Sequence, residues 1–174
     1  MKRTVSRSVS AAAVALLAVA TACSDAHDPL SPKLQAWNQP PPPQTSELKG
    51  TGTIPDPEGG LITFNFDVTH DATGTHGSFF AAAAPPGGPP ETLTATSFTS
   101  FTVGSSFCTT PSNGDEFEAV GTLVEGASSF PGTSFIVRAC DNGSAAMLMD
   151  TFSIDIPSRG FHAAGTVVGD IQKR

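Results

Sequence analysis

Aromatic and charged residues are scarce in this chain of 174 residues, which contains no tyrosine, one tryptophan, 9 Lys and Arg, and 16 Asp and Glu. A net charge of −7 argues against a nucleic-acid binder, which needs a basic face. The lack of tyrosine argues against carbohydrate recognition, because Tyr and Trp rings are the usual platforms on which sugars stack. The 17 glycines and 15 prolines argue against a helical bundle. The length suits one domain.

The apolar run at residues 11–22 is too short for a membrane span, since its 12 residues compare with the roughly 20 that a spanning helix needs. It follows Lys2, Arg3 and Arg7, and this order is typical of a secretory signal peptide over residues 1–22. Cys23 comes next, after three small residues. This arrangement resembles a bacterial lipobox, in which the cysteine is acylated and becomes the mature N-terminus. The sequence therefore predicts lipidation of Cys23. The alternative is cleavage by an ordinary signal peptidase and no anchor.

An acylated Cys23 would hold the protein at a membrane stably, because its acyl chains exceed the two signals that anchoring requires. The predicted location is the extracytoplasmic side of a bacterial cell envelope. Ser24, rather than Asp, follows the cysteine and favours the outer membrane or the cell surface. Residues 23–49 are rich in proline and predict an extended tether. Trp37 lies in this tether, and we expect it either to contact a membrane interface or partner, or to rest loosely on the domain or on the prolines.

Residues 50–174 are predicted to form the folded domain, because their apolar residues alternate with polar ones. Residues 61–68, for example, place Ile62, Phe64, Phe66 and Val68 on one face. Six similar runs follow, at residues 77–83, 92–103, 117–123, 135–140, 152–156 and 161–167. A change of phase between Phe98 and Phe101 predicts a bulge or bend. The pattern predicts an all-β fold, an antiparallel sandwich or small barrel of about seven to eight short strands. All 12 Phe lie within this region, so phenylalanine should dominate the core.

A family resemblance lies in the order of five segments: FNFDV, VGTL, SFIVRACDNG, DTFSIDI and GFHAAGTVVGDIQ. This order resembles the small bacterial secreted β-module called the post-COAP domain, over residues 50–172. The resemblance implies an extracytoplasmic β-domain, often appended to other proteins, and it brings no catalytic residues to this chain. The chain departs from the family at the proline-glycine loop of residues 85–90, at Cys108, and at an insertion between Gly143 and Asp150.

Cys108 and Cys140 are the two cysteines that remain after lipidation. A secreted chain resides in an oxidising compartment, so the pair predicts a disulfide. Cys140 alternates with Phe135 and Val137 and should face away from the core, so the bond would fasten a loop to the outside of a strand. Two unpaired thiols are the alternative.

Asp141, Asn142 and Asp150 flank a glycine turn and are the candidate metal site. Clustered carboxylate and amide oxygens can bind Ca²⁺, although no complete calcium-loop motif is present. The simpler interpretation is an Asx-turn, with Asp150 capping the next strand. His70, His76 and His162 match no zinc pattern. We expect no cofactor and assign no catalytic residue.

The sequence therefore predicts a non-enzymatic lipoprotein domain, anchored in the cell envelope, with a structural or interaction role. Its partners would be the membrane, through the lipid anchor, and an unidentified envelope protein, but no nucleic acid. One alternative is a binding module for Ca²⁺ or a small apolar ligand. Another is a hydrolase assembled from loops. A filled interior without convergent polar groups would favour the non-enzymatic lipoprotein. An open phenylalanine-lined cavity would favour the binding module, and a carboxylate pair or a Ser–His contact in a cleft would favour the hydrolase.

Overall fold

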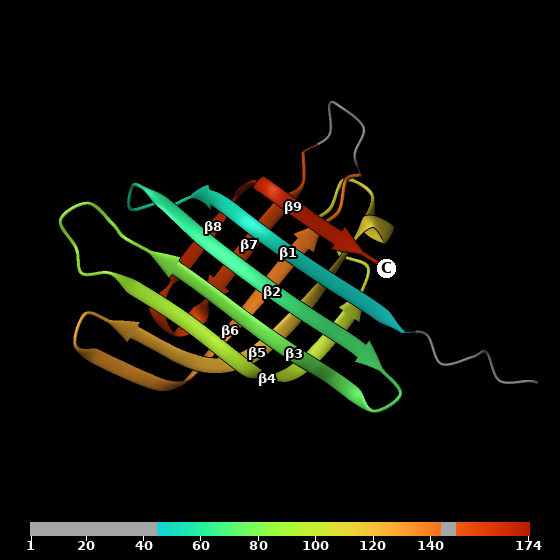
Figure 1. The fold of residues 1–174 in the computed structure, drawn as a ribbon, viewed down its shortest axis with the longest axis horizontal. Helices are drawn as coiled ribbons and strands as arrows, with labels where there is room; N and C mark the ends of the chain where they lie inside the picture. The colour runs from blue at the N-terminus through green and yellow to red at the C-terminus, as the bar shows by residue number, and fades with distance from the viewer. Residues whose placement is uncertain (1–44, 144–148) are drawn as a thin grey trace, which may run out of the picture. The chain divides into compact units, whose positions relative to one another are not determined.

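The computed structural model describes residues 45–143 and 149–174, which form nine antiparallel strands in one sheet. Neighbours along the chain are neighbours in the sheet, except that β9 lies beside β1, as Figure 1 shows. The predicted all-β antiparallel fold is thus confirmed. The strands are β1 (Ser46–Pro55), β2 (Leu61–Asp71), β3 (Gly74–Ala83), β4 (Glu91–Val103), β5 (Gly114–Glu125), β6 (Ser128–Cys140), β7 (Thr151–Ile156), β8 (Phe161–Thr166) and β9 (Val168–Lys173), with short 3₁₀ turns η1 (Pro111–Asn113) and η2 (Pro157–Arg159).

The last run of the chain nearly closes the sheet into a barrel. The first part of this run, β8, pairs with β7. A single residue separates it from the second part, β9, which pairs with β1. Val167, which lies between the two strands, is buried, and its N–H donates to the backbone carbonyl of Asp150 over 2.8 Å. The two ends of the sheet are therefore joined by covalent chain rather than by a continuous ladder.

Phenylalanine fills the interior of this barrel, as the sequence predicts. Phe64 of β2 stacks on Phe152 of β7 with 4.0 Å between ring centroids, so rings from opposite walls meet in the middle. Burial of each ring contributes roughly 1.5–3 kcal/mol relative to exposure. The completely or almost completely buried rings are Phe64, Phe66, Phe79, Phe117, Phe135 and Phe152.

The strand count exceeds the predicted seven to eight because β1 and β9 were not expected. β1 begins at Ser46, four residues before the predicted domain boundary at Gly50. Two of its inward positions are glycines, so the alternation of apolar and polar side chains that predicts a strand is interrupted there. Glycine is required at position 50 because a Cβ there would lie 2.4 Å from the Phe66 ring. In β4 the pairing register shifts between Phe98 and Ser100, which confirms the predicted bend.

The connections alternate between two ends of the barrel. The end at which β1 begins and β9 finishes is called the terminal end here. It also carries the β2–β3, β4–β5 and β6–β7 connections. The opposite, hairpin end carries the β1–β2, β3–β4, β5–β6 and β7–β8 connections, which project to the left in Figure 1. Within the described ranges, no helix has the length and hydropathy of a membrane span. The predicted signal peptide, Cys23 and most of the tether lie outside the described residues.

Candidate functional site

A cleft of about 430 Å³ opens at the hairpin end, and we call it the hairpin-end cleft. Its floor continues into an apolar depression of only 30 Å³, which has room for about one or two water molecules. The interior beyond that floor is filled by the phenylalanine core. The cleft is lined by Pro57, Glu58, Glu91, Leu123, Glu125, Ile156, Arg159, Gly160, Phe161 and His162. The floor adds Ile62, Ala81, Ala82, Ala83, Thr92, Leu93 and Ile154 to Glu91, Leu123, Ile156 and Phe161.

Negative charge dominates the rim of this cleft. Glu91 of β4 lies directly opposite Glu125 of β5 in the strand register, and Glu58 comes from the β1–β2 loop. Partial burial raises the pKa of Glu91 above its ordinary value, and the charges of Glu125, Glu58 and Asp56 raise it further. Such mutual repulsion disfavours ionisation of a carboxyl group, so an approaching cation would find this rim favourable.

One basic side chain, Arg159 of η2, contributes to the rim. Its Nη1 lies 2.8 Å from Glu125 Oε1, and its guanidinium lies over the Phe130 ring, 4.3 Å from the centroid. Arg159 therefore pairs directly with Glu125, and its charge offsets only part of the repulsion that raises the pKa of Glu91. The negative charges of Glu58, Glu91 and Asp56 remain in excess at this end of the barrel.

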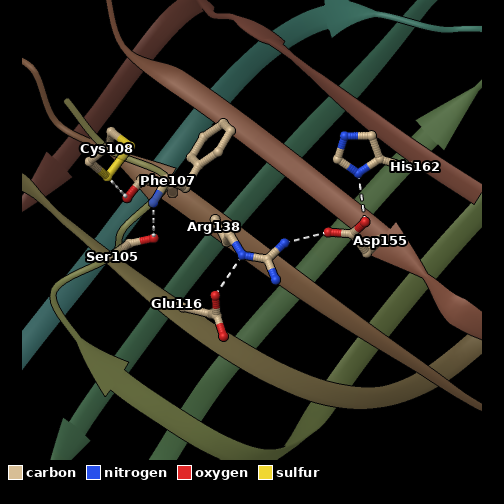
Figure 2. A network of polar contacts seen from close by, with 9 residues as sticks. Ser105, Phe107, Cys108, Glu116, Arg138, Asp155 and His162 are labelled. Atoms are coloured by element: carbon tan, nitrogen blue, oxygen red, sulfur yellow. Dashed lines mark hydrogen bonds and ion pairs between the residues drawn. A yellow bond between two sulfur atoms is a disulfide. The ribbon is translucent and has the colours of Figure 1, made fainter. Parts of the chain in front are cut away.

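A second polar group lies on the outer face of the sheet, where Figure 2 shows Arg138 between two carboxylates. Arg138 Nε donates to Glu116 Oε2 over 2.6 Å, and Nη1 donates to Asp155 Oδ2 over 2.5 Å. Burial works against the charged guanidinium, but the hydrogen bonds and charges of Asp155 and Glu116 outweigh it, and the pKa of Arg138 is raised. The network joins β5, β6 and β7.

Asp155 also contacts an imidazole, since its Oδ1 lies 2.6 Å from Nδ1 of His162 on β8. A carboxylate and a histidine are two members of a nucleophilic triad. The serine on the same face of β7, Ser153, is completely buried and cannot reach a substrate. The geometry therefore indicates a structural role, in which these polar contacts link the four neighbouring strands β5 to β8.

The Oγ atom of Ser153 is buried, and among the described residues it has no hydrogen-bond partner. An unsatisfied buried hydroxyl costs about 1–3 kcal/mol. Ser153→Ala should therefore raise the free energy of unfolding by about 1 kcal/mol in urea denaturation. The exposed Ser129 of β6 is the matched control, and Ser129→Ala should change stability by less than about 0.5 kcal/mol. Destabilisation by Ser153→Ala would show that the hydroxyl has a partner in solution.

The predicted disulfide between Cys108 and Cys140 is present, with 5.6 Å between Cα atoms. Cys140 faces outward on β6 yet is completely buried, as expected where a fastened loop covers the strand. The loop packs so closely that a Cβ at Gly114 would lie 2.3 Å from Cys108 Sγ. The disulfide therefore holds the β4–β5 connection against the outside of β6.

A buried ion pair lies beside this loop, and the sequence did not reveal it. Asp115 of β5 has no exposed surface, and its Oδ1 accepts from Lys173 Nζ over 2.5 Å and from the Gly104 N–H over 2.8 Å. Its Oδ2 accepts from Ser46 Oγ over 2.8 Å. One carboxylate thus connects the first strand, the last strand and the β4–β5 loop.

The candidate metal residues also hold the last strand. Asp150 Oδ2 accepts the N–H of Ile171, and Asp141 Oδ2 accepts the N–H of Lys173, over 2.7 and 3.0 Å. Both N–H groups point away from β1, so the carboxylates replace the acceptors that another strand would supply.

The other carboxylate oxygens of the candidate metal site accept from the turn. Asp150 Oδ1 accepts the N–H of Asn142, and Asp141 Oδ1 accepts that of Gly143 in an Asx-turn. In the described part of the chain, no group of three or more His, Cys, Asp or Glu is arranged to hold a metal ion. Calcium binding at Asp141, Asn142 and Asp150 stays a prediction.

The sequence did not predict the cleft because its carboxylates lie far apart along the chain, in the β1–β2 loop, at the start of β4 and at the end of β5. The sequence nevertheless indicated where in the fold each acid lies, although not its role. Glu58 lies between Pro57 and Gly59, Glu91 follows Pro90, and Glu125 precedes Gly126. Each acid therefore adjoins a turn, and in an up-and-down sheet alternate turns share one end.

Comparisons with protein families, with curated proteins and with solved structures gave no match to this chain. The resemblance to the post-COAP domain therefore stays a prediction that rests on the sequence segments quoted above.

Proposed function

We propose that the protein is a non-enzymatic lipoprotein of the bacterial cell envelope, whose β-barrel domain has an interaction role. The observation that carries the proposal is the placement of the cleft. β1 begins at the terminal end, so a tether from Cys23 would attach there, while the hairpin-end cleft lies at the opposite end. The domain would present its cleft away from the membrane.

The charge of the exposed end suggests the kind of partner. Glu58, Glu91 and Glu125 all line the hairpin-end cleft. Among residues 50–172, 13 are acidic and 2 are basic, so a partner of the exposed end would need to be cationic.

The filled interior favours interaction over storage of a ligand. A drug-sized ligand site usually occupies roughly 300–1,000 Å³ of concave space, and the apolar depression of 30 Å³ is far smaller. The wider cleft is open to solvent and suits a side chain presented from outside. Glu91 and Glu125 form a carboxylate pair there, but Arg159 already neutralises one of the two.

The anchor is tested by labelling cells with palmitate. The native chain should incorporate label and remain with membranes, whereas Cys23→Ser should do neither. Label on the Cys23→Ser chain would contradict the proposal.

The interaction role is tested by photo-cross-linking in intact cells. A photoreactive residue at Ser128, on the hairpin end, should give adducts of defined mass. The same residue at Ser112, on the terminal end, is the matched control and should give none of these adducts. Absence of adducts at Ser128 would exclude an interaction at the hairpin end.

A further inference from the structure

The hairpin-end cleft combines an apolar floor with a charged rim. Its floor is apolar, with Leu123, Ile156 and Phe161 shared between the wide cleft and the depression beneath it. Its rim carries Glu58 and Glu91, whereas the ion pair that Arg159 makes at this rim is with Glu125. A complementary group therefore needs a slender apolar stem that ends in a positive charge.

We propose that the hairpin-end cleft binds a lysine side chain that a partner protein presents, with the methylene stem on the apolar floor and the ammonium between Glu58 and Glu91. This inference rests on the proposed interaction role and names the chemistry of the partner. Lysine stems lie along apolar surface while their charged heads stay polar, which matches the order of floor and rim.

An ammonium fits this rim better than a guanidinium. Glu91 and Glu125 are cross-strand neighbours on β4 and β5, whereas Glu58 comes from the β1–β2 loop, so Glu58 and Glu91 do not form one planar acceptor. A compact ammonium has three rotatable donors, whereas a guanidinium needs carboxylates in the plane of its rigid fork. A metal ion is a poorer occupant, because within residues 45–143 and 149–174 no suitable group of three ligands is formed.

An exposed ring beside the cleft favours a protein segment over a free amine. Phe130, which lies under Arg159 of the rim, is 39% exposed. It would contact a residue next to the bound lysine, whereas a free diamine would leave it uncovered.

The experiment uses a capped pentapeptide with lysine at its centre and leucine on both sides. Calorimetric titration into the full chain in neutral detergent should show binding. A peptide with norleucine in place of lysine keeps the stem and loses the charge, so it should bind at least tenfold more weakly. Equal binding of the two peptides, or no binding of the lysine peptide, would overturn the inference.

Variants of the rim locate the binding. Glu91→Gln and Glu58→Gln should each weaken the lysine peptide at least fivefold, whereas Glu118→Gln, on β5 outside the cleft, should change its affinity less than twofold. All three remove one negative charge, so equal weakening would indicate net charge alone and reject the cleft. Thermal unfolding of each variant shows that the fold is intact.

The two proposals can fail separately. If Ser128 cross-links to a partner while the lysine peptide does not bind, the interaction role stands and the lysine inference is wrong. If palmitate labelling and cross-linking both fail, the proposed function is wrong, whatever the peptide does.

Discussion

Asp115→Ala should lower the free energy of unfolding by about 3–5 kcal/mol, which is the usual cost of leaving one partner of a buried ion pair alone. Asp115 is completely buried, and Lys173 keeps only 16% of its side chain exposed. Removal of the carboxylate leaves the Lys173 ammonium without its ion-pair partner. It also leaves the Ser46 hydroxyl and the Gly104 N–H without an acceptor. Urea denaturation followed by circular dichroism measures the loss.

Two further variants separate the charge from the hydrogen bonds. Asp115→Asn keeps an oxygen for Gly104 or Ser46 but loses the ion pair, so it should cost less than alanine. Lys173→Met leaves the Asp115 charge buried without its partner and should cost about as much as Asp115→Ala. The double variant of Asp115→Asn with Lys173→Met should regain part of the lost stability, because neither charge is then buried without its partner. A loss below about 1 kcal/mol for Asp115→Ala would show that water replaces the pair.

The position of Asp115 explains this large effect. β8 and β9 close the sheet through chain connectivity, so the terminal end lacks a continuous ladder of backbone hydrogen bonds. Asp115 supplies side-chain contacts at that place, and Asp141 and Asp150 supply two more along β9. Three carboxylates therefore compensate for the incomplete closure.

The fold class could be predicted from the sequence because period-two alternation and phenylalanine placement are local signals. The closure could not be predicted, since it depends on whether residues after Thr166 continue past β7 to reach β1. Asp115 did carry a local signal. It shares the inward phase of Phe117 and Ala119, and an acid in that phase is either buried or at the strand end. Its partner Lys173 is 58 residues away, and no spacing rule connects them.

The hairpin-end cleft was missed for a related reason. Glu58, Glu91 and Glu125 are brought together by the order of strands, and only Glu91 and Glu125 are directly paired. Acids beside Pro and Gly are usually solvated turn residues, so each alone carries no functional signal. The disulfide, in contrast, was predictable, because the predicted lipidation of Cys23 leaves Cys108 and Cys140 with a single possible pairing.

Removal of the disulfide should lower the free energy of unfolding by about 3–4 kcal/mol, the value that the chain-entropy model assigns to a closed loop of this size. The two cysteines are separated by 32 residues. The paired variant Cys108→Ala with Cys140→Ala removes the bond without leaving a lone thiol. Its stability should match that of the native chain under reducing conditions, which is the internal control. Two thiols labelled by alkylation before any reduction would contradict the bond itself.

The effects of the disulfide and of Asp115 should not be additive. The loop that Cys108 fastens also carries Gly104, whose N–H donates to Asp115 Oδ1. When the loop is released, this donor is no longer held in place, so part of the Asp115 contribution is already lost. Combining Asp115→Ala with the paired cysteine variant should therefore cost at least about 0.5 kcal/mol less than the sum of the separate losses. A strictly additive loss in urea denaturation would mean that Ser46 and Lys173 alone position the carboxylate, and that the loop contributes nothing to it.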